Sequence, residues 1–159
     1  MTTQIRALKS GDRPALEAVL RSDATFDSDE IDVALELVDD ALAKESSDYW
    51  FQIAEVDGAV AGYICFGPTP MTDSTYDLYW IVTHAEFRGQ RIAQTLIRSM
   101  EQILLKRGPK AQIRVETSQT EGYGAARKLY DRMGYPEVAR FTNFYKQGDD
   151  LIVFFKSIP

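Results

Sequence analysis

The run Arg88-Gly89-Gln90-Arg91-Ile92-Ala93 places a glycine and two arginines directly before a long segment of helical periodicity. The first turn of a helix presents unpaired N–H groups and the positive end of the helix dipole, which together suit a phosphate group. Gly89 has no side chain, so a ligand can approach its backbone closely, and Arg88 and Arg91 add positive charge. These features predict a phosphate-binding turn. The alternative is an ordinary strand-to-helix turn with two surface arginines.

Two common phosphate motifs are absent from the sequence. There is no G-x-x-x-x-G-K-[ST] run, which excludes a P-loop nucleoside triphosphatase. There is also no G-x-G-x-x-G run, so a Rossmann dinucleotide site is unsupported. A phosphate-bearing ligand would therefore have to be bound by a fold of another kind.

Periodicity and turn residues define the elements that position this turn. Strands are predicted over residues 5–8, 49–56, 59–66, 76–83, 112–117, 138–145 and 151–156. Helices are predicted from Ser10 or Asp12 to about Arg21, from Asp27 or Ser28 onward, and over residues 90–107 and 124–133. The order is one strand, two helices, three strands, a helix, a strand, a helix and two strands. This order indicates an α/β domain on a mixed sheet, and we expect residues 1–159 to form a single domain.

Two motifs resemble those of one known family, the GNAT family of N-acetyltransferases. The phosphate-binding turn is similar to that family's pyrophosphate loop, Q/R-x-x-G-x-G/A. Downstream, Ala126-x-x-Leu129-Tyr130-x-x-x-Gly134-Tyr135 resembles the family's A-x-x-L-Y-x-x-x-G-F/Y segment. The order and separation of the motifs match, and the element order fits over nearly the whole chain. The resemblance implies a single-domain GNAT-like fold, with a mixed, mostly antiparallel sheet of about seven strands flanked by about four helices.

The resemblance also implies an activity and a cofactor site. The reaction would be direct transfer of an acetyl group from acetyl-CoA to a primary amine of a small molecule or peptide, with no acyl-enzyme and no metal. The strands over residues 76–83 and 112–117 would splay to admit coenzyme A. Backbone groups that hold the pantetheine arm would come from Ile81, Val82 and Thr83. Those that hold the pyrophosphate would come from Arg88, Gly89, Gln90, Arg91, Ile92 and Ala93.

Catalytic roles follow from the same resemblance. Tyr130 matches a family tyrosine that often protonates the leaving thiolate, and a phenol of pKa about 10 can serve a thiol of pKa about 8.5 if it is positioned to do so. A core aromatic is the alternative for Tyr130. Glu116 is the candidate base that removes a proton from the amine, with Asp77 as a weaker candidate, and either could act through water. A surface carboxylate is the alternative for Glu116.

Two positions depart from the family pattern. Arg91 stands at the usual middle glycine of the loop. If that position needs a positive φ, arginine costs roughly 1 kcal/mol, which a contact between its guanidinium and a phosphate could offset. Tyr123 stands where many members have asparagine before the second motif helix.

Charge narrows the set of partners. The chain has a formal net charge of −6, and an acidic domain is a poor general binder of nucleic acid. From Asp23 to Asp57 there are twelve acidic residues and one basic residue, Lys44. In the family the early helices commonly border the acceptor cleft. We therefore expect a cationic acceptor, such as a polyamine, an aminoglycoside-like amine or a lysine side chain.

The remaining sequence features concern the cellular compartment of the protein and its capacity to bind metals. The chain has one cysteine, Cys65, and one histidine, His84, so it can form neither an internal disulfide nor a standard structural zinc site. We expect Cys65 to be a buried thiol and His84 to be a loop residue. No apolar run approaches the ~20 residues that span a membrane, and the first ten residues lack the apolar core of a signal peptide. A cytoplasmic protein without membrane contact is expected.

A run of aromatic residues near the C-terminus is predicted to be mostly strand core, with any exposed excess available for a homodimer surface. Its members are Phe141, Phe144, Tyr145, Phe154 and Phe155. Two rival functions stay open at this stage. One is a catalytically degenerate acyl-CoA-binding or sensory module, and the other is a structural interaction domain without affinity for coenzyme A.

Overall fold

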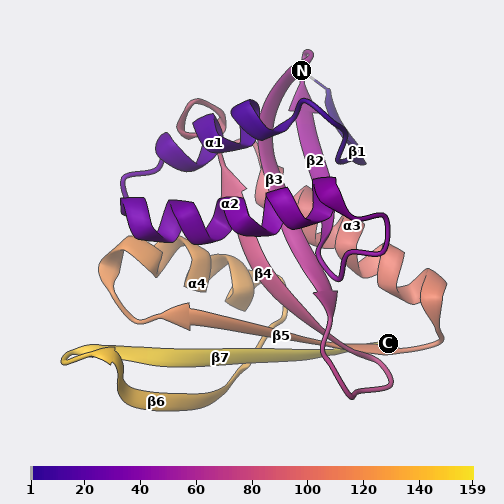
Figure 1. Ribbon diagram of the computed structural model, residues 1–159. Helices are drawn as coiled ribbons and strands as arrows, with labels where there is room; N and C mark the ends of the chain where they lie inside the picture. Colours follow the sequence, from indigo (N-terminus) through magenta and orange to yellow (C-terminus); the bar gives the residue numbers. More distant parts are fainter. Residues whose placement is uncertain (1) are drawn as a thin grey trace.

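The element order predicted from the sequence is confirmed in the computed structural model, which describes residues 2–159 (Figure 1). The strands are β1 (Thr3–Ala7), β2 (Trp50–Val56), β3 (Ala59–Pro68), β4 (Thr75–Thr83), β5 (Ala111–Ser118), β6 (Glu137–Lys146) and β7 (Asp149–Ile158). The helices are α1 (Arg13–Arg21), α2 (Ser28–Ala43), α3 (Ile92–Arg107) and α4 (Gly124–Arg132), with short 3-10 turns η1 (Ala85–Phe87) and η2 (Glu121–Tyr123).

The strands form one sheet in the order β1-β2-β3-β4-β5-β7-β6. Neighbouring strands are antiparallel except β4 and β5, which are parallel. The helices α1 and α2 pack on one face of the sheet, and α3 and α4 pack on the other (Figure 1). The predicted α/β fold, with a mixed and mostly antiparallel sheet flanked by helices, is therefore confirmed.

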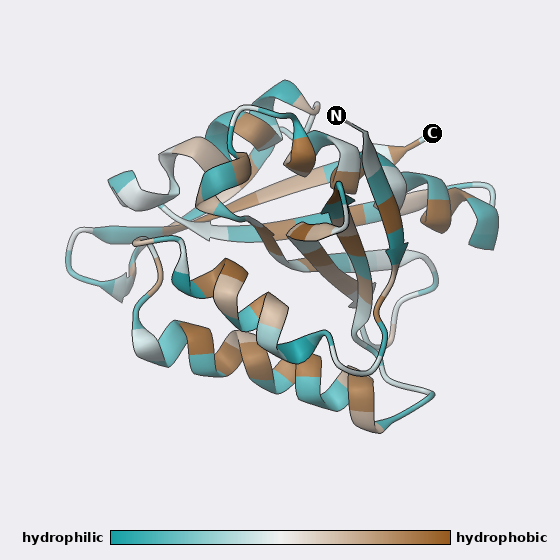
Figure 2. Cartoon of the chain, turned by 90° about the horizontal axis from the view of Figure 1, so that it is seen from above, coloured by the Kyte–Doolittle hydropathy of each residue, from teal (hydrophilic) through white to brown (hydrophobic). Residues whose placement is uncertain are grey.

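Each face of the sheet carries its own apolar cluster. Along β3 the side chains alternate: Tyr63 and Cys65 belong to the cluster under α1 and α2, whereas Ile64 and Phe66 belong to the cluster under α3 and α4. Figure 2 shows the central strands mostly hydrophobic and the helices banded with hydrophobic and hydrophilic residues, as expected for helices that cover a sheet. Cys65 is a buried thiol as predicted, and burial raises its pKa.

Two predicted helix caps have different outcomes. The α2 cap is confirmed: the Asp27 carboxylate accepts a hydrogen bond from the Glu30 N–H at 2.8 Å, and the Glu30 carboxylate accepts one from the Asp27 N–H at 3.2 Å. At α1, Asp12 occupies the N-cap position but its side chain makes no cap bond. Instead the Asp12 carboxylate accepts two hydrogen bonds from the Arg6 guanidinium, at 2.8 and 2.9 Å. The two Asp12 carboxylate oxygens are thus bonded to Arg6, and one of them also accepts a hydrogen bond from the Lys9 N–H at 2.9 Å, instead of bonding the N–H groups of α1.

The strands β4 and β5 diverge after a short paired stretch. Backbone pairing joins residues 75–78 of β4 to residues 112–115 of β5. Beyond Leu78, β4 stays paired with β3 up to Thr83, and β5 stays paired with β7. A bulge at Tyr79 lies at the point of divergence. Within residues 2–159, the edge of β4 that faces β5 therefore has no strand partner beyond Leu78, and the predicted splay is present.

The aromatic side chains of the edge strand β6 are more exposed than expected. Phe141, Phe144 and Tyr145 on β6 are 53%, 58% and 49% exposed, whereas Phe154 on β7 is buried. The prediction that this aromatic run is mostly strand core is wrong for β6. Aromatic content indicates a strand but does not tell a central strand from an edge strand, and β6 is at the edge. The homodimer surface linked to these side chains stays a prediction.

Candidate active site

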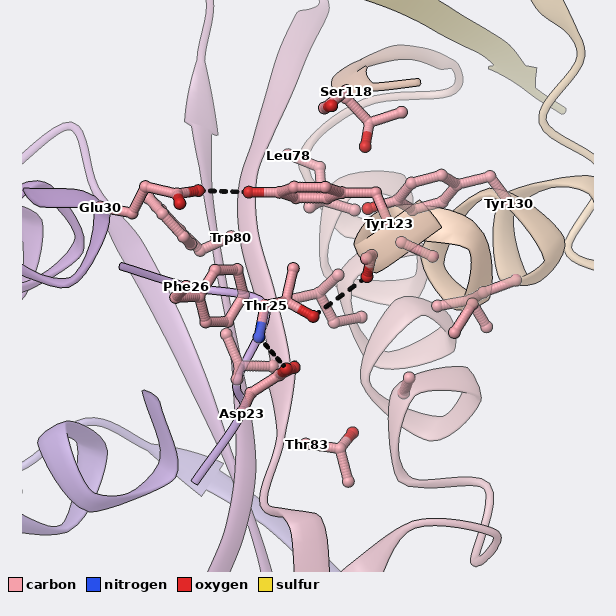
Figure 3. A pocket seen from close by; sticks show the side chains of 18 of the residues that line it. Asp23, Thr25, Phe26, Glu30, Leu78, Trp80, Thr83, Ser118, Tyr123 and Tyr130 are labelled. Carbon is pink, nitrogen blue, oxygen red and sulfur yellow. Dashed lines mark hydrogen bonds between the residues drawn. The ribbon is translucent and has the colours of Figure 1, made fainter. Parts of the chain in front are cut away.

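A cleft of about 1780 Å³ occupies the splay between β4 and β5. Its walls come from the segment between α1 and α2, the second half of β4, the N-terminus of α3, the end of β5, and α4. Residues from both faces of the sheet line it, as Figure 3 shows in close-up. The cleft brings together side chains that are more than a hundred residues apart in the sequence, such as Asp23 and Tyr130.

The predicted phosphate-binding turn lines this cleft. After η1, the backbone takes positive φ at Gly89 (80°) and at Arg91 (60°), and α3 begins at Ile92. The helix was predicted to begin two residues earlier. The left-handed conformation of Arg91 prevents this, because a residue in that conformation cannot be part of a right-handed helix. The first residues of α3 follow this turn directly, and Ile92, Ala93 and Gln94 line the cleft.

Close packing fixes the start of α3 against the sheet. The Ile92 side chain is buried, and one of its methyl groups would lie 3.2 Å from a Cβ placed on Gly62 of β3. That Cβ would also lie 2.5 Å from the carbonyl oxygen of Val82, so only glycine fits at position 62. This close approach holds the start of α3 beside the end of β4.

The residues expected to hold a pantetheine arm lie on the free edge of β4. Val82 is buried in the cluster under α1 and α2, while Ile81 packs against the opposite cluster. Ile81, Val82 and Thr83 all line the cleft. His84 follows as a loop residue, as predicted, and its Nδ1 accepts a hydrogen bond from the Glu86 N–H at 3.1 Å. A free strand edge of this kind can pair with an extended, amide-containing chain.

Tyr130 is a core aromatic and also a cleft residue. Its ring packs against Phe154 and Tyr135, with centroids 5.3 and 6.2 Å apart, and it is 4% exposed. It nevertheless lines the cleft (Figure 3). Within residues 2–159 no hydrogen bond to its hydroxyl is found, and burial raises its pKa. The hydroxyl is therefore protonated at neutral pH and free to donate a hydrogen bond.

The two candidate bases have different surroundings. Asp77 is buried, and its carboxylate accepts hydrogen bonds from the Thr69 hydroxyl and from the Arg114 guanidinium, both at 2.7 Å. Glu116 lines the cleft with its side chain 47% exposed, and its carboxylate lies 3.9 Å from the Arg114 guanidinium. Asp77 is thus held in place by two partners. Glu116 has a solvent-exposed carboxylate in the cleft.

Sequence reasoning missed a bridge across the mouth of the cleft. The Tyr123 hydroxyl donates a hydrogen bond to the Glu30 carboxylate, and the Thr25 hydroxyl donates one to the Gly122 carbonyl at 3.1 Å (Figure 3). The Phe26 ring packs edge-on against Tyr123, with centroids 6.3 Å apart. The sequence carried one signal that this position is special, which is a tyrosine where the family usually has asparagine.

Charged side chains of both signs line the cleft, and some of them are paired with each other, such as Arg88 with Asp23 and Arg114 with Asp77. The acidic side chains Glu30, Glu116 and Asp149 come from α2, β5 and β7. They surround Tyr145, whose pKa is raised by burial and then by these three carboxylates. Positive side chains that line the cleft include Arg91, directly before α3, and Lys128 and Arg132 on α4. A ligand with an anionic part and a cationic partner would suit this arrangement.

Two further properties hold for the part of the chain that the structure describes. No group of three or more His, Cys, Asp or Glu side chains is arranged to hold a metal ion. No helix within residues 2–159 combines the length and the apolar character needed to cross a membrane.

Known proteins share this sequence pattern and this fold. Residues 13–135 match the sequence model of the Acetyltransferase (GNAT) family. A Desulfovibrio desulfuricans protein assigned to the GNAT family is 33% identical over 98% of both chains, with a TM-score of 0.90. The ribosomal-protein-S18-alanine N-acetyltransferase of Escherichia coli is 20% identical over 99% of this chain and 94% of its own, with a TM-score of 0.77. The PaiA N-acetyltransferase of Thermoplasma acidophilum, solved with coenzyme A, is 18% identical over 99% of this chain and 100% of its own, also with a TM-score of 0.77.

Proposed function

This chain belongs to the acetyltransferase (GNAT) family, and we propose that it transfers the acetyl group of acetyl-CoA directly to a primary amine. One observation supports the proposal. The turn from Arg88 to Ala93 and the buried Tyr130, whose hydroxyl is unbonded within residues 2–159, line one cleft in the splay between β4 and β5. Acetyl-CoA has a pyrophosphate at one end of its pantetheine arm and a thioester at the other, so the cleft suits both ends.

The proposed cofactor site uses mostly backbone groups. The N–H groups at the start of α3 and the turn from Arg88 to Ala93 would bind the pyrophosphate. The free edge of β4 from Ile81 to Thr83 would pair with the amide groups of pantetheine, as an added strand would. Backbone recognition explains why the side chains along this edge can be apolar and can pack into the core.

The proposed chemistry needs one acid and one base. The amine nitrogen attacks the thioester carbonyl carbon, the carbon–sulfur bond breaks, and the thiolate takes a proton from the Tyr130 hydroxyl. A tyrosine hydroxyl carries its proton at neutral pH even at its ordinary pKa of about 10. Burial raises the pKa of Tyr130 and so makes it a weaker acid, which means that the proton transfer depends on its position beside the thiolate. Glu116 would take the proton that the amine loses, through a water molecule, because its carboxylate is solvated in the same cleft. Asp77 is the weaker candidate because its carboxylate is already engaged by the Arg114 guanidinium and the Thr69 hydroxyl.

The acceptor is proposed to be a cationic small molecule or a peptide amine. Glu30, Glu116 and Asp149 place three carboxylates around the cleft. Asp149 is buried and accepts a hydrogen bond from the Ser118 hydroxyl at 2.5 Å, so its charge is fixed in position. Carboxylates in a partly enclosed cleft attract cations and raise their local concentration.

A two-stage experiment tests the proposal. Calorimetric titration with coenzyme A is followed by an assay of free thiol with acetyl-CoA and pairs of neutral and cationic amines of equal length. We expect binding, thiol release and a preference for the cationic amine. Gly89→Glu is expected to abolish binding, because it adds a negative charge at the turn, and Gly89→Ala controls for the strained φ of 80°. Binding without thiol release would indicate a sensory module, and no binding would indicate a structural domain.

A further inference from the structure

Arg114 on β5 is a positive side chain on the face of the sheet that α1 and α2 cover. Its neighbours Ile113 and Val115 pack into the cluster under α3 and α4. Because side chains alternate along a strand, Arg114 and Glu116 point to the opposite face, and both line the cleft. Arg114 therefore lies on the same face as Glu116 and as α2, which carries Glu30. These are carboxylates proposed above to attract the acceptor.

The Arg114 guanidinium is held in one orientation. Its Nε donates a hydrogen bond to one carboxylate oxygen of Asp77 at 2.7 Å, and Asp77 is the residue opposite Arg114 in the pairing of β4 with β5. Asp77 is 7% exposed, and its other carboxylate oxygen accepts a hydrogen bond from the Thr69 hydroxyl at 2.7 Å. A planar guanidinium that is fixed at Nε has its two terminal NH2 groups fixed as well. The direction of these donors is thus set before any ligand binds.

The two terminal NH2 groups of Arg114 have no hydrogen-bond acceptor within residues 2–159. The guanidinium approaches Glu116 to 3.9 Å through Nε, and the Arg114 side chain is 41% exposed. Arg127 shows the structural alternative, since one of its terminal nitrogens donates to the carbonyl groups of Ser118 and Thr120, both at 2.8 Å. Pairing with Asp77 uses only the Nε of Arg114. Two parallel donors therefore remain in a residue that lines an open cleft.

Resting on the function proposed above, we propose that the terminal NH2 groups of Arg114 bind a carboxylate of the acceptor, and that the acceptor is an α-amino acid. Two parallel guanidinium donors can bind both oxygen atoms of a carboxylate. Glu116, two residues further along the same face, is the base proposed for the amine. An α-amino acid carries its amine and its carboxylate on one carbon atom, so a single ligand matches this adjacent positive and negative pair.

This assignment narrows the acceptor class. The protonated amine of the amino acid is the cationic group that the carboxylates of the cleft attract. The first residue of a peptide has an amide in place of its carboxylate, so a peptide would leave the two donors of Arg114 unpaired. The acceptor is thus a free small molecule.

Free α-amino acids and their primary amides differ in this carboxylate, so their relative turnover tests the assignment. The free-thiol assay would use acetyl-CoA with a panel of common α-amino acids that lack a thiol, and with the amide of each. We expect at least one free amino acid to have a kcat/KM about tenfold or more above that of its amide, as for a charged hydrogen bond. Intrinsic reactivity works against this result, because the carboxylate favours the protonated form of the neighbouring amine.

Arg114→Gln removes the charge and should bring the ratio of the two kcat/KM values close to one. The KM for the free amino acid should rise with little change in kcat, because the carboxylate contact is made equally in the ground state and the transition state. If Arg114 acts only through the basicity of Glu116, free amino acids and amides are affected alike and the ratio survives.

Two further variants control for folding and for charge. Arg114→Gln leaves the buried Asp77 without its partner, so Asp77→Asn combined with Arg114→Gln gives a neutral pair in its place. Thermal melts and calorimetric titration with coenzyme A show whether each variant folds. Arg140→Gln is the matched control, since Arg140 pairs with Glu137 at 3.1 Å and does not line the cleft, and it should keep the ratio of the parent.

Equal or faster turnover of the amide for every amino acid would overturn the proposal. A preference for the free amino acid that survives in Arg114→Gln or in the double variant would overturn it too. Thiol release with simple amines but with no amino acid would have the same meaning, and would leave the proposed acetyl transfer intact. If no amine of any kind releases thiol, the proposed function itself is wrong.

Discussion

The hydroxyl of Tyr123 donates a hydrogen bond to the carboxylate of Glu30, which joins two segments 93 residues apart across the mouth of the cleft. Tyr123 immediately precedes α4, and Glu30 lies in the first turn of α2. The splay is open between β4 and β5, so this bond and the one from Thr25 to Gly122 connect its two sides. A ligand in the splay would be surrounded by the two strands and by this bridge.

Tyr123→Phe removes the hydroxyl and keeps the ring packed against Phe26. A bridge that has to open for ligand exchange slows both entry and exit. We therefore expect the variant to raise the association and dissociation rate constants of coenzyme A together, by up to about tenfold, with little change in Kd. Stopped-flow binding measures both rate constants. Tyr145→Phe is the control, since it removes a hydroxyl from the same cleft that makes no hydrogen bond within residues 2–159. An increase in the dissociation rate alone would indicate instead that the Tyr123 hydroxyl contacts the ligand.

Arg91 has a left-handed backbone with φ of 60°, at a position where the family usually has glycine. Arg91→Gly should relieve this strain and raise the free energy of unfolding by roughly 1 kcal/mol relative to Arg91→Ala, because alanine keeps the strain while also removing the charge. Chemical denaturation of the two variants measures that difference.

The same two variants separate strain from ligand binding. If the Arg91 guanidinium contacts phosphate, both should bind coenzyme A about tenfold more weakly than the parent, and the loss should shrink as salt rises. Tighter binding by Arg91→Gly than by the parent would show that Arg91 is not a phosphate ligand.

Tyr63 contains a buried hydroxyl without a hydrogen-bond partner in the part of the chain that the structure describes. Its ring stacks on Phe51 under α1 and α2, with centroids 5.7 Å apart. Removing an unsatisfied polar group from a core relieves its desolvation cost, so Tyr63→Phe should stabilise the fold by about 1 kcal/mol. Tyr135→Phe is the matched contrast, because its hydroxyl donates to Glu101 at 2.7 Å, and it should be destabilising. A lower Tm for Tyr63→Phe than for the parent would contradict this expectation.

The features predictable from the sequence are those set by neighbouring residues or by the family motifs. The helical spacing after Arg91 and the capping pair Asp27 and Glu30 are local, and both led to the correct elements. Long-range partners could not be found in this way. Nothing near Tyr123 in the sequence indicates Glu30, since their contact depends on how α2 and α4 meet across the sheet. The exposure of Phe144 likewise depends on the position of β6 at the sheet edge, which aromatic content does not reveal.

The structure also sharpens the expectation for Tyr130. Tyr130→Phe keeps the ring that packs against Phe154 and removes only the hydroxyl. That hydroxyl makes no hydrogen bond within residues 2–159, so the change in the free energy of unfolding should be about 1 kcal/mol or less. A loss of stability well above that value would mean that the hydroxyl has a structural partner.

If the Tyr130 hydroxyl protonates the leaving thiolate, kcat should fall by about 10²-fold or more in the phenylalanine variant. The KM for acetyl-CoA should change little, because the missing interaction acts mainly in the transition state. Initial rates and thermal melts on one preparation separate this result from unfolding. Tyr135→Phe serves as the second variant, because the Tyr135 ring packs against the Tyr130 ring but Tyr135 does not line the cleft, and its kcat should stay close to the parent value. Parent-like turnover in Tyr130→Phe would exclude Tyr130 as the acid and leave the thiolate to be protonated by solvent.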